Sequence, residues 1–323
     1  MKVVERYPEK ISPAYRRLIN WTAPADPLAR AVVASDVELE GTDLDPSAEH
    51  SYEVAPGVQH KYQDTVLLTV TARCASFCRY CFRKRLWASG AEHRFDAETA
   101  VSYVAEHPEI VDVVLSGGDP LLAPRRMLVK LLDEFSNISH VRTLRIGTRS
   151  PVYAPRLASN RRLLATLRRV GRRVGVYVVI HYCHPRELSP SLEAVRRLQR
   201  AGATVLAQIP VLRGINDAPG VLAELLLGVT AAGVAPYYLF QCRPTAGNAH
   251  FALTLGEAWT VFDRETAGLS GISRRARLVA SHASGKLEVV GLDGDDVLMR
   301  RHRRPRGSTE TTLRRVKSDA YWP

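Results

Sequence analysis

The sequence predicts an α/β fold, a partial (β/α)6 TIM-type barrel of parallel strands with an N-terminal arm and a C-terminal cap. Three observations predict it. Short apolar runs alternate with amphipathic stretches six times between residues 66 and 251. The runs are rich in Val, Ile and Leu, as buried parallel strands are. Polar side chains lie at or near the ends of the runs, where such barrels place their chemistry.

The six strand-like runs are Val66–Thr71, Val111–Leu115, Val141–Ile146, Val174–His181, Thr204–Leu212 and Val234–Gln241. Between them we expect helices, because apolar residues recur three and four positions apart. Such stretches are Arg161–Val170, Leu188–Ala201 and Val221–Ala232. A glycine directly follows each of these three stretches, where a helix C-cap is expected: Gly171, Gly202 and Gly233.

The chain divides into three predicted regions. With 323 residues, 46% of them apolar, it is long enough for one large or two modest domains. Residues 1–65 are predicted to be a helical and extended arm, and residues 66–251 the barrel core. Residues 252–323 are predicted to be a cap, with a helix at Leu255–Ala267 and a hairpin around His282–Lys286.

Composition excludes several classes of protein. The sequence holds no run of 18 apolar residues, so no membrane span is expected. Met1–Lys10 is charged and lacks the apolar stretch of a secretory signal. Five cysteines, three of them clustered, predict a reducing cytoplasm rather than a disulfide framework.

The net charge of +12 is concentrated at the C-terminus. Met299–Pro323 contains eight Lys/Arg and two acidic residues, and so supplies +6 of the total. A basic tail of this kind is typical of a solvated or loosely docked end. A nucleic-acid partner is therefore not expected.

Three cysteines, Cys74, Cys78 and Cys81, form a C-x3-C-x2-C triplet with a tyrosine before the last. Three thiolates at this spacing can bind three irons of a [4Fe–4S] cube and leave the fourth iron open. We expect the open iron to chelate the amino and carboxylate groups of S-adenosylmethionine. A structural zinc site would normally need four ligands in C-x2–4-C pairs, and the chain has no second pair.

Other polar residues occupy the same predicted rim. Ser116, Gly117, Gly118 and Asp119 form a small-residue turn after the second strand. Two glycines allow close approach of the backbone, so Asp119 or the backbone carbonyls could receive the ammonium of S-adenosylmethionine. Taken alone, this segment is only a turn. Three further residues lie on later strands, namely His181 at the end of the fourth, Gln208 within the fifth and Arg243 after the sixth.

Several segments between about residues 55 and 255 resemble the lysine 2,3-aminomutase family of radical S-adenosylmethionine enzymes, in matching order and approximate spacing. They are His60-Lys61-Tyr62-Gln63-Asp64, Cys74–Arg85, Leu115–Pro120, Arg145–Pro151, His181-Tyr182-Cys183-His184-Pro185, Leu212–Asp217 and Pro236-Tyr237-Tyr238. The cap resembles the family more weakly.

The resemblance implies a radical isomerase. In that family the cluster cleaves S-adenosylmethionine to a 5′-deoxyadenosyl radical. The radical takes hydrogen from Cβ of an amino acid attached to pyridoxal phosphate, whose amino group then migrates. His181 and Gln208 match positions lining the S-adenosylmethionine site. A flavodoxin or ferredoxin is the expected electron donor, and a homo-oligomer is left open.

Whether the chain binds pyridoxal phosphate depends on Lys286. By resemblance Lys286 is the lysine that holds the cofactor, although its loop is shorter than the family's and has one glycine, and a lysine after a hairpin glycine is usually solvated. Lys61 and Tyr62 match a basic residue and a tyrosine near the phosphate. Thr65 stands where the family has a second arginine.

Two arginines bear on the substrate. Arg83 matches the residue that binds the substrate α-carboxylate, for which a guanidinium is suited; the alternative is an ion pair within the basic run Arg83-Lys84-Arg85. Arg243 stands where the lysine enzyme has an aspartate. An ammonium beside it would cost on the order of 4 kcal/mol at an effective dielectric of about 20. An acidic amino acid such as glutamate is therefore the simplest substrate, unless Arg243 turns away to pair with a local acid.

Three other functions stay open. A radical epimerase, dehydrogenase or dehydratase would not need pyridoxal phosphate. A modifying enzyme acting on a protein or RNA would use the basic tail to dock. A non-enzymatic iron–sulfur protein would not cleave S-adenosylmethionine. Cys183 and Cys242 are expected to be small core or rim residues.

Overall fold

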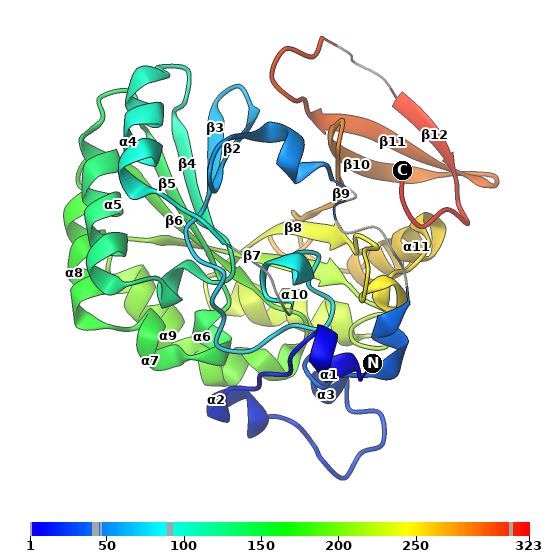
Figure 1. The fold of residues 1–323 in the computed structure, drawn as a ribbon. Coiled ribbons are helices and arrows are strands. Elements are labelled where there is room, and N and C mark those ends of the chain that lie inside the picture. Colours follow the sequence, from blue (N-terminus) through cyan, green and yellow to red (C-terminus); the bar gives the residue numbers. More distant parts are fainter. Residues whose placement is uncertain (1, 41–44, 46, 89–92, 310–312) are drawn as a thin grey trace.

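The computed structural model describes residues 2–40, 45, 47–88, 93–309 and 313–323. Its described strands form one sheet, in which the order of neighbours from β1 to β12 equals their order along the chain (Figure 1). Among the described helices, none combines the length and the apolar character that crossing a bilayer requires.

Six parallel strands form the centre of the sheet and curve into an open, partial (β/α)6 barrel. They are β3 (Thr65–Thr69), β4 (Asp112–Ser116), β5 (Thr143–Thr148), β6 (Gly175–His181), β7 (Thr204–Val211) and β8 (Ala235–Gln241). Each predicted run matches one of these strands, with both ends within two residues of the prediction. The predicted fold class is confirmed.

Helices cover the outer face of these strands (Figure 1). The long ones are α4 (Ala97–Glu106), α5 (Arg125–Asn137), α8 (Arg161–Val170), α9 (Leu188–Arg200) and α10 (Val221–Ala231). The three predicted helices are confirmed. Gly202 and Gly233 adopt the left-handed conformation just past their helices, whereas Gly171 is right-handed because the chain continues in a further turn that bonds back to Val170.

Short helical turns lie in the loops of the barrel. They are η3 (Lys84–Leu86), η4 (Pro120–Leu122), α6 (Ser150–Tyr153), α7 (Pro155–Ala158), η5 (Pro185–Glu187) and η6 (Ala249–Phe251).

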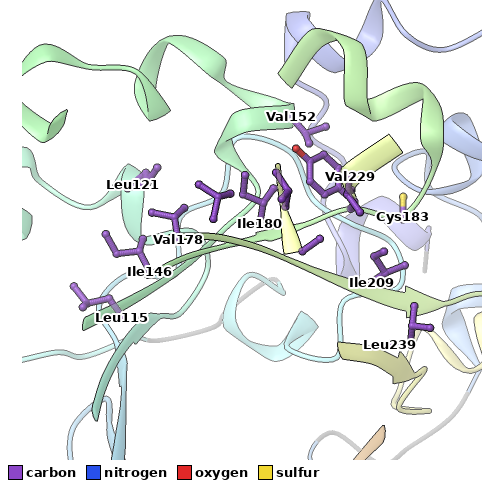
Figure 2. Close-up of a cluster of buried hydrophobic side chains, with 14 of the residues drawn as sticks. Leu115, Leu121, Ile146, Val152, Val178, Ile180, Cys183, Ile209, Val229 and Leu239 are labelled. Atoms are coloured by element: carbon purple, nitrogen blue, oxygen red, sulfur yellow. The ribbon is translucent and has the colours of Figure 1, made fainter. Parts of the chain in front are cut away.

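The two faces of the parallel sheet carry different side chains. Leu115, Ile146 and Val178 are register neighbours on β4, β5 and β6, and they pack together in the buried cluster of Figure 2. Alternate residues on the same strands, such as Val179 and His181, line a cavity instead. Successive side chains of a strand point to opposite faces. When one set packs in the core between the strands and the helices, the residues between them therefore point into the cavity.

The N-terminal region wraps the barrel before joining the sheet. Its helical turns are α1 (Val3–Arg6), α2 (Pro13–Arg16), α3 (Pro27–Arg30), η1 (Asp36–Leu39) and η2 (Glu49–Tyr52), and its strands are β1 (Glu53–Ala55) and β2 (Val58–Tyr62). β2 pairs antiparallel with β1 and with β3.

The C-terminal region continues the same sheet. Helix α11 (Leu255–Thr266) confirms the predicted helix, and β9 (Arg277–His282) pairs parallel with β8. The predicted hairpin is the tight turn between β9 and β10 (Gly285–Asp293). The division of the chain after residues 65 and 251 stays a prediction.

The basic tail contributes strands rather than a loose end, which corrects the sequence-based expectation. β11 (Asp296–Arg303) and β12 (Leu313–Lys317) pair antiparallel with each other, and β11 pairs with β10. Part of the tail's charge is also paired locally, because Arg300 bonds to Glu288 and Lys317 to Asp296. β11 buries Val297 and Met299 and then continues into the basic run 300–303, so part of the charge of this tail is carried by a strand.

A buried ion cluster fastens the N-terminal region to the loop that carries the cysteines. Glu38 is fully buried, and its carboxylate accepts hydrogen bonds from Arg79 Nε at 2.9 Å and Lys84 Nζ at 2.6 Å. Arg79 also donates to the backbone oxygens of Tyr7 and Pro8. Burial lowers the pKa of Lys84 to about 8 despite the opposite charge of Glu38.

We expect Glu38→Gln to lower the free energy of unfolding by about 3–5 kcal/mol, because Arg79 would remain buried without its counter-ion. Denaturant unfolding of the variant measures the loss. Glu40→Gln is the matched control, since Glu40 is exposed and two residues away. A loss for Glu38→Gln as small as the control's would show that the cluster does not fasten the two segments.

Candidate active site

The inner face of the barrel encloses a cavity of about 380 Å³. Strand ends, the N-terminal region and the C-terminal strands all contribute to its lining. Every candidate residue predicted from the sequence lies on this lining, namely Lys61, Tyr62, Cys74, Cys78, Cys81, Arg83, Ser116, Gly117, Gly118, Asp119, His181, Gln208, Arg243 and Lys286. The structure therefore brings these residues together, and their individual roles remain predictions.

The three cysteines sit on one loop after β3. Their thiols are free, all three line the cavity, and Cys78 and Cys81 lie close enough to Cys74 to raise its pKa. A [4Fe–4S] cube binds each thiolate through a different iron, so three cysteines of one loop can hold three of its irons. Burial raises the pKa of Cys74 and of Cys81.

Two side chains to which the sequence analysis assigned no role reach Cys78. Arg149 Nη1 lies 3.2 Å and the Tyr153 hydroxyl 3.1 Å from the Cys78 sulfur. Arg149 also forms a buried ion pair with Glu187. Hydrogen bonds of this kind stabilise a thiolate and influence the potential of a cluster bound to it. The position of Arg149 at the end of β5 was the available signal, since the other strand ends carry polar residues too.

The turn after β4 packs tightly against the start of the cysteine loop. Gly117 has a φ of +120°, and a Cβ there would clash with the carbonyl oxygen of Thr71. At Gly118 a Cβ would lie 2.6 Å from the carbonyl oxygen of Arg73. Any side chain at either position would separate the two segments, so the glycines are required by this close approach.

Asp119 holds strand ends together. Its buried carboxylate accepts hydrogen bonds from the hydroxyls of Thr148 and Ser150 and from the backbone N–H groups of Leu121 and Arg149, all at 2.8–3.0 Å. These bonds use most of the acceptor capacity of one carboxylate. For the ammonium of a ligand, the backbone carbonyls of the turn are thus better placed as acceptors than Asp119.

His181 and Gln208 are register neighbours on β6 and β7, and both face the cavity. The Tyr80 ring stacks on His181, and its hydroxyl lies 3.1 Å from Nε2. Burial and the charge of Arg149 lower the pKa of His181 well below its usual value. The imidazole is therefore neutral at pH 7 and can hydrogen-bond a ligand without adding charge.

Arg83 binds a protein carboxylate in this structure. Its Nε and Nη2 donate to Glu49 at 3.1 and 2.8 Å, and Nη1 donates to the Ser116 hydroxyl at 2.9 Å. Arg85 pairs with the same carboxylate. Burial alone would raise the pKa of Glu49, but the neighbouring arginines hold it well below its usual range. This part of the site can therefore bind a carboxylate. The ion pair that the sequence left open for Arg83 is formed with Glu49.

Arg243 presents an unpaired donor to the cavity. Its guanidinium lies 4.0 Å from the centre of the Phe82 ring, and its buried Nη1 has no hydrogen-bond partner among the described residues. No carboxylate described in the structure lies within ion-pair distance of it, although the charge of Glu49 is near enough to oppose the pKa shift. Burial lowers the pKa of Arg243 to about 10, which still leaves the side chain charged at neutral pH.

Lys286 reaches the cavity from β10. Its Nζ lies 4.0 Å from the centre of the Tyr238 ring and 5.3 Å from that of Phe240, and no carboxylate in the described residues pairs with it. Burial, followed by the charge of Arg303, lowers its pKa to about 7. The side chain is therefore not a solvated turn lysine, and much of it is neutral near physiological pH.

Further polar atoms on the described lining, donors and one amide oxygen, lack hydrogen-bond partners. Within the described part of the chain, the cavity is lined by five side chains with a buried polar atom that makes no hydrogen bond: Tyr62, Arg149, Gln241, Arg243 and Trp322. Each such atom costs about 1–3 kcal/mol when left unsatisfied. A concentration of them in one cavity is typical of a site that binds polar ligands.

The remaining two cysteines are buried, as expected of core or rim residues. Cys183 contacts Glu187 and Arg149 behind the cavity wall. Cys242 lines the cavity, and burial raises its pKa to about 12.

Comparisons with known proteins agree with this geometry. The model of the Radical SAM superfamily matches residues 68–226. A protein of Aquifex aeolicus (strain VF5) named "Putative L-lysine 2,3-aminomutase" is 38% identical over 329 residues, which cover 99% of this chain and 88% of that protein.

Two further relatives are named "L-lysine 2,3-aminomutase". The protein of Escherichia coli (strain K12) is 37% identical over 73% of this chain and 69% of its own length. That of Methanococcus maripaludis is 32% identical over 93% of this chain and 72% of its own length. Among solved structures, Streptococcus suis SuiB bound to S-adenosylmethionine has a TM-score of 0.51 at 11% identity, over 69% of this chain and 51% of its own, which supports the fold alone.

Proposed function

Because this chain belongs to the lysine 2,3-aminomutase family of radical S-adenosylmethionine enzymes, we propose that it shifts the amino group of an acidic amino acid such as glutamate, with pyridoxal phosphate as a second cofactor. The observation that carries the choice of substrate is the unpaired, buried guanidinium of Arg243 on the lining of the cavity.

Each cofactor has suitable residues on the lining. Cys74, Cys78 and Cys81 would hold the cluster, and the backbone of the Ser116–Gly118 turn with His181 and Gln208 would position S-adenosylmethionine. When bound, the cluster and S-adenosylmethionine supply a 5′-deoxyadenosyl radical that removes hydrogen, and pyridoxal phosphate carries the migrating amino group.

The lining around Lys286 fits pyridoxal phosphate. Lys286 has a neutral amine available near pH 7, as covalent attachment of a carbonyl cofactor requires. The buried hydroxyl of Tyr62 has no hydrogen-bond partner within the described ranges of the chain, and Lys61 lies on the same lining. The aromatic rings of Tyr238 and Phe240 beside Lys286 keep water away from the amine.

The arginines select the substrate. Arg83 is placed to bind an α-carboxylate in the position where Glu49 now lies, and Arg243 is placed to bind a second, distal carboxylate. An ammonium on the substrate side chain would face Arg243 and be repelled. This is the reason for proposing an acidic substrate for a chain whose relatives are named for lysine. The five free thiols support a reducing compartment, so a cytoplasmic location is part of the proposal.

The test is an anaerobic assay of the reconstituted protein with S-adenosylmethionine, a reductant and pyridoxal phosphate. We expect 5′-deoxyadenosine and the 3-amino isomer to form from glutamate, with little isomer from lysine and none without pyridoxal phosphate. Preferred turnover of lysine would contradict the assignment of Arg243. Conversion of substrate without pyridoxal phosphate would favour an epimerase or dehydrogenase, and absence of S-adenosylmethionine cleavage would favour a non-enzymatic iron–sulfur protein.

A further inference from the structure

The end of the cavity beside Lys286 is strongly cationic. Lys61, Arg145, Arg243 and Arg303 all lie close enough to Lys286 to lower its pKa. Arg145 is neutralised by an ion pair with Asp112. Lys61 already donates to the backbone oxygen of His282 at 2.6 Å. Positive charge in excess of the carboxylates that face it is the environment that a phosphate group requires.

Arg303 contacts two residues of the expected phosphate site, Tyr62 and Thr65. It comes from β11 and donates through Nη2 to the Thr65 hydroxyl at 3.0 Å. Its guanidinium carbon lies 4.2 Å from the centre of the Tyr62 ring. Arg303 also pairs with Asp64, whose side chain is 55% exposed, so solvent screens that pair.

The fold fixes Arg303 opposite Lys286. The two residues are register partners on β10 and β11. Gly285 precedes Lys286 with a φ of +118°, and a Cβ there would clash with the carbonyl oxygen of Arg303. The two strands therefore approach each other as closely as backbone allows, and this brings the guanidinium and the amine to the same end of the cavity.

Tyr62 and Arg303 offer donors that suit an anionic ligand. The buried Tyr62 hydroxyl has no hydrogen-bond partner among the described residues. The hydrogen bonds of Arg303 to described residues both come from Nη2, which leaves its Nε and Nη1 without a described acceptor. A phosphate carries a charge of about −1.5 to −2 at pH 7 and offers three acceptor oxygens, which match this set of donors.

We propose that Arg303 binds the phosphate of pyridoxal phosphate together with Tyr62. This inference rests on the proposed function, because it assumes that the cofactor is attached at Lys286. Thr65 stands where the family resemblance implies a second arginine. Arg303 of β11 donates to the Thr65 hydroxyl and so brings a guanidinium to that position. The phosphate site and the cofactor lysine then belong to the same pair of strands.

The test compares pyridoxal phosphate with pyridoxal, which lacks the phosphate, by titrating the visible absorbance of the protein-bound chromophore. We expect Arg303→Gln to weaken binding of pyridoxal phosphate by about 10- to 150-fold, the range expected for a hydrogen-bonded charged group. The affinity for pyridoxal changes far less. The ratio of the two affinities also cancels any effect of the lost charge on the reactivity of Lys286.

Arg304→Gln is the matched control, because Arg304 is the exposed neighbour outside the cavity and loses the same charge. Arg303→Lys keeps the charge and is expected to retain part of the preference for pyridoxal phosphate over pyridoxal. It therefore tests the role of the charge even if Arg303→Gln does not fold. Inorganic phosphate competes with pyridoxal phosphate for the wild-type protein and more weakly for Arg303→Gln.

An unchanged affinity ratio in Arg303→Gln, with the wild-type protein still binding the cofactor, would overturn the role of Arg303 alone. An equal loss for both ligands would show that Arg303 only supports the hairpin. Absence of binding of either ligand to the wild-type protein would instead refute the pyridoxal phosphate part of the proposed function, and this inference with it.

Discussion

Lys286→Ala is expected to abolish the borohydride-reducible attachment of pyridoxal phosphate to the protein. The fold places the amine of Lys286 on the lining of the cavity, where burial lowers its pKa to about 7, and alanine offers no nucleophile in its place. Isomerisation of the substrate is lost with the attachment. Mass analysis of the peptide that contains residue 286, after borohydride reduction, measures the effect directly.

Lys317→Ala is the matched control for this experiment. Lys317 lies on the outer strand β12, where it is exposed and paired with Asp296, so its loss leaves the pyridoxyl label on residue 286. A label that persists in Lys286→Ala at full stoichiometry, on Lys61 or on another lysine, would show that Lys286 is not the point of attachment.

The pH dependence of the attachment follows from the lowered pKa of Lys286. Only the neutral amine attacks the carbonyl, and the neutral form becomes the major one as the pH rises through about 7. In wild-type protein the rate of labelling should therefore rise about tenfold per pH unit below 7 and level off above it. An ordinary lysine, with a pKa near 10.4, would continue to gain reactivity up to pH 10. Rates measured between pH 6 and 9 distinguish the two cases.

Arg243→Asp is expected to reverse the choice of substrate. The guanidinium favours a distal carboxylate and repels an ammonium, and each contact is worth on the order of 4 kcal/mol at an effective dielectric of about 20. Replacing the charge by its opposite should shift the ratio of kcat/KM for glutamate over lysine by roughly 1,000-fold or more. The two kcat/KM values, measured for wild-type and variant protein, give the shift.

Two controls accompany this experiment. Arg243→Lys keeps the charge but not the planar fork, and should retain a weaker preference for glutamate. The pyridoxyl label on Lys286 should survive in both variants, which shows that the cavity is intact. An unchanged substrate ratio in Arg243→Asp would mean that Arg243 does not contact the substrate side chain.

The central strands could be predicted from the sequence because their burial is local and continuous. Runs such as Val174–His181 leave few alternatives to a buried strand, and β6 begins one residue later than predicted. The Gly117-Gly118 turn and the cysteine triplet were recognisable for the same reason, since their chemistry is contained in a few consecutive residues. The outer strands β11 and β12 were not, because β11 runs from an apolar block into a basic one and β12 buries none of its residues, so neither shows the pattern of a core strand.

Contacts between distant segments could not be predicted from sequence patterns. Glu49 and Arg83 are 34 residues apart, and Arg303 and Thr65 are 238 residues apart. No sequence periodicity links such pairs, because the tertiary fold determines which of the many charged residues come into contact. The partners of Arg83 and of Arg303 therefore become apparent only in the folded chain.

The agreement between strand order and chain order has a consequence for biogenesis. A polypeptide that emerges from its N-terminus meets, at each new strand, the strand made just before it as its partner. The loop with Cys74, Cys78 and Cys81 is synthesised about two hundred residues before Lys286 and Arg303. The wall of the cavity that carries the cysteines is therefore translated before the wall that carries Lys286 and Arg303, and the lining is complete only when β10 and β11 have been added to the sheet.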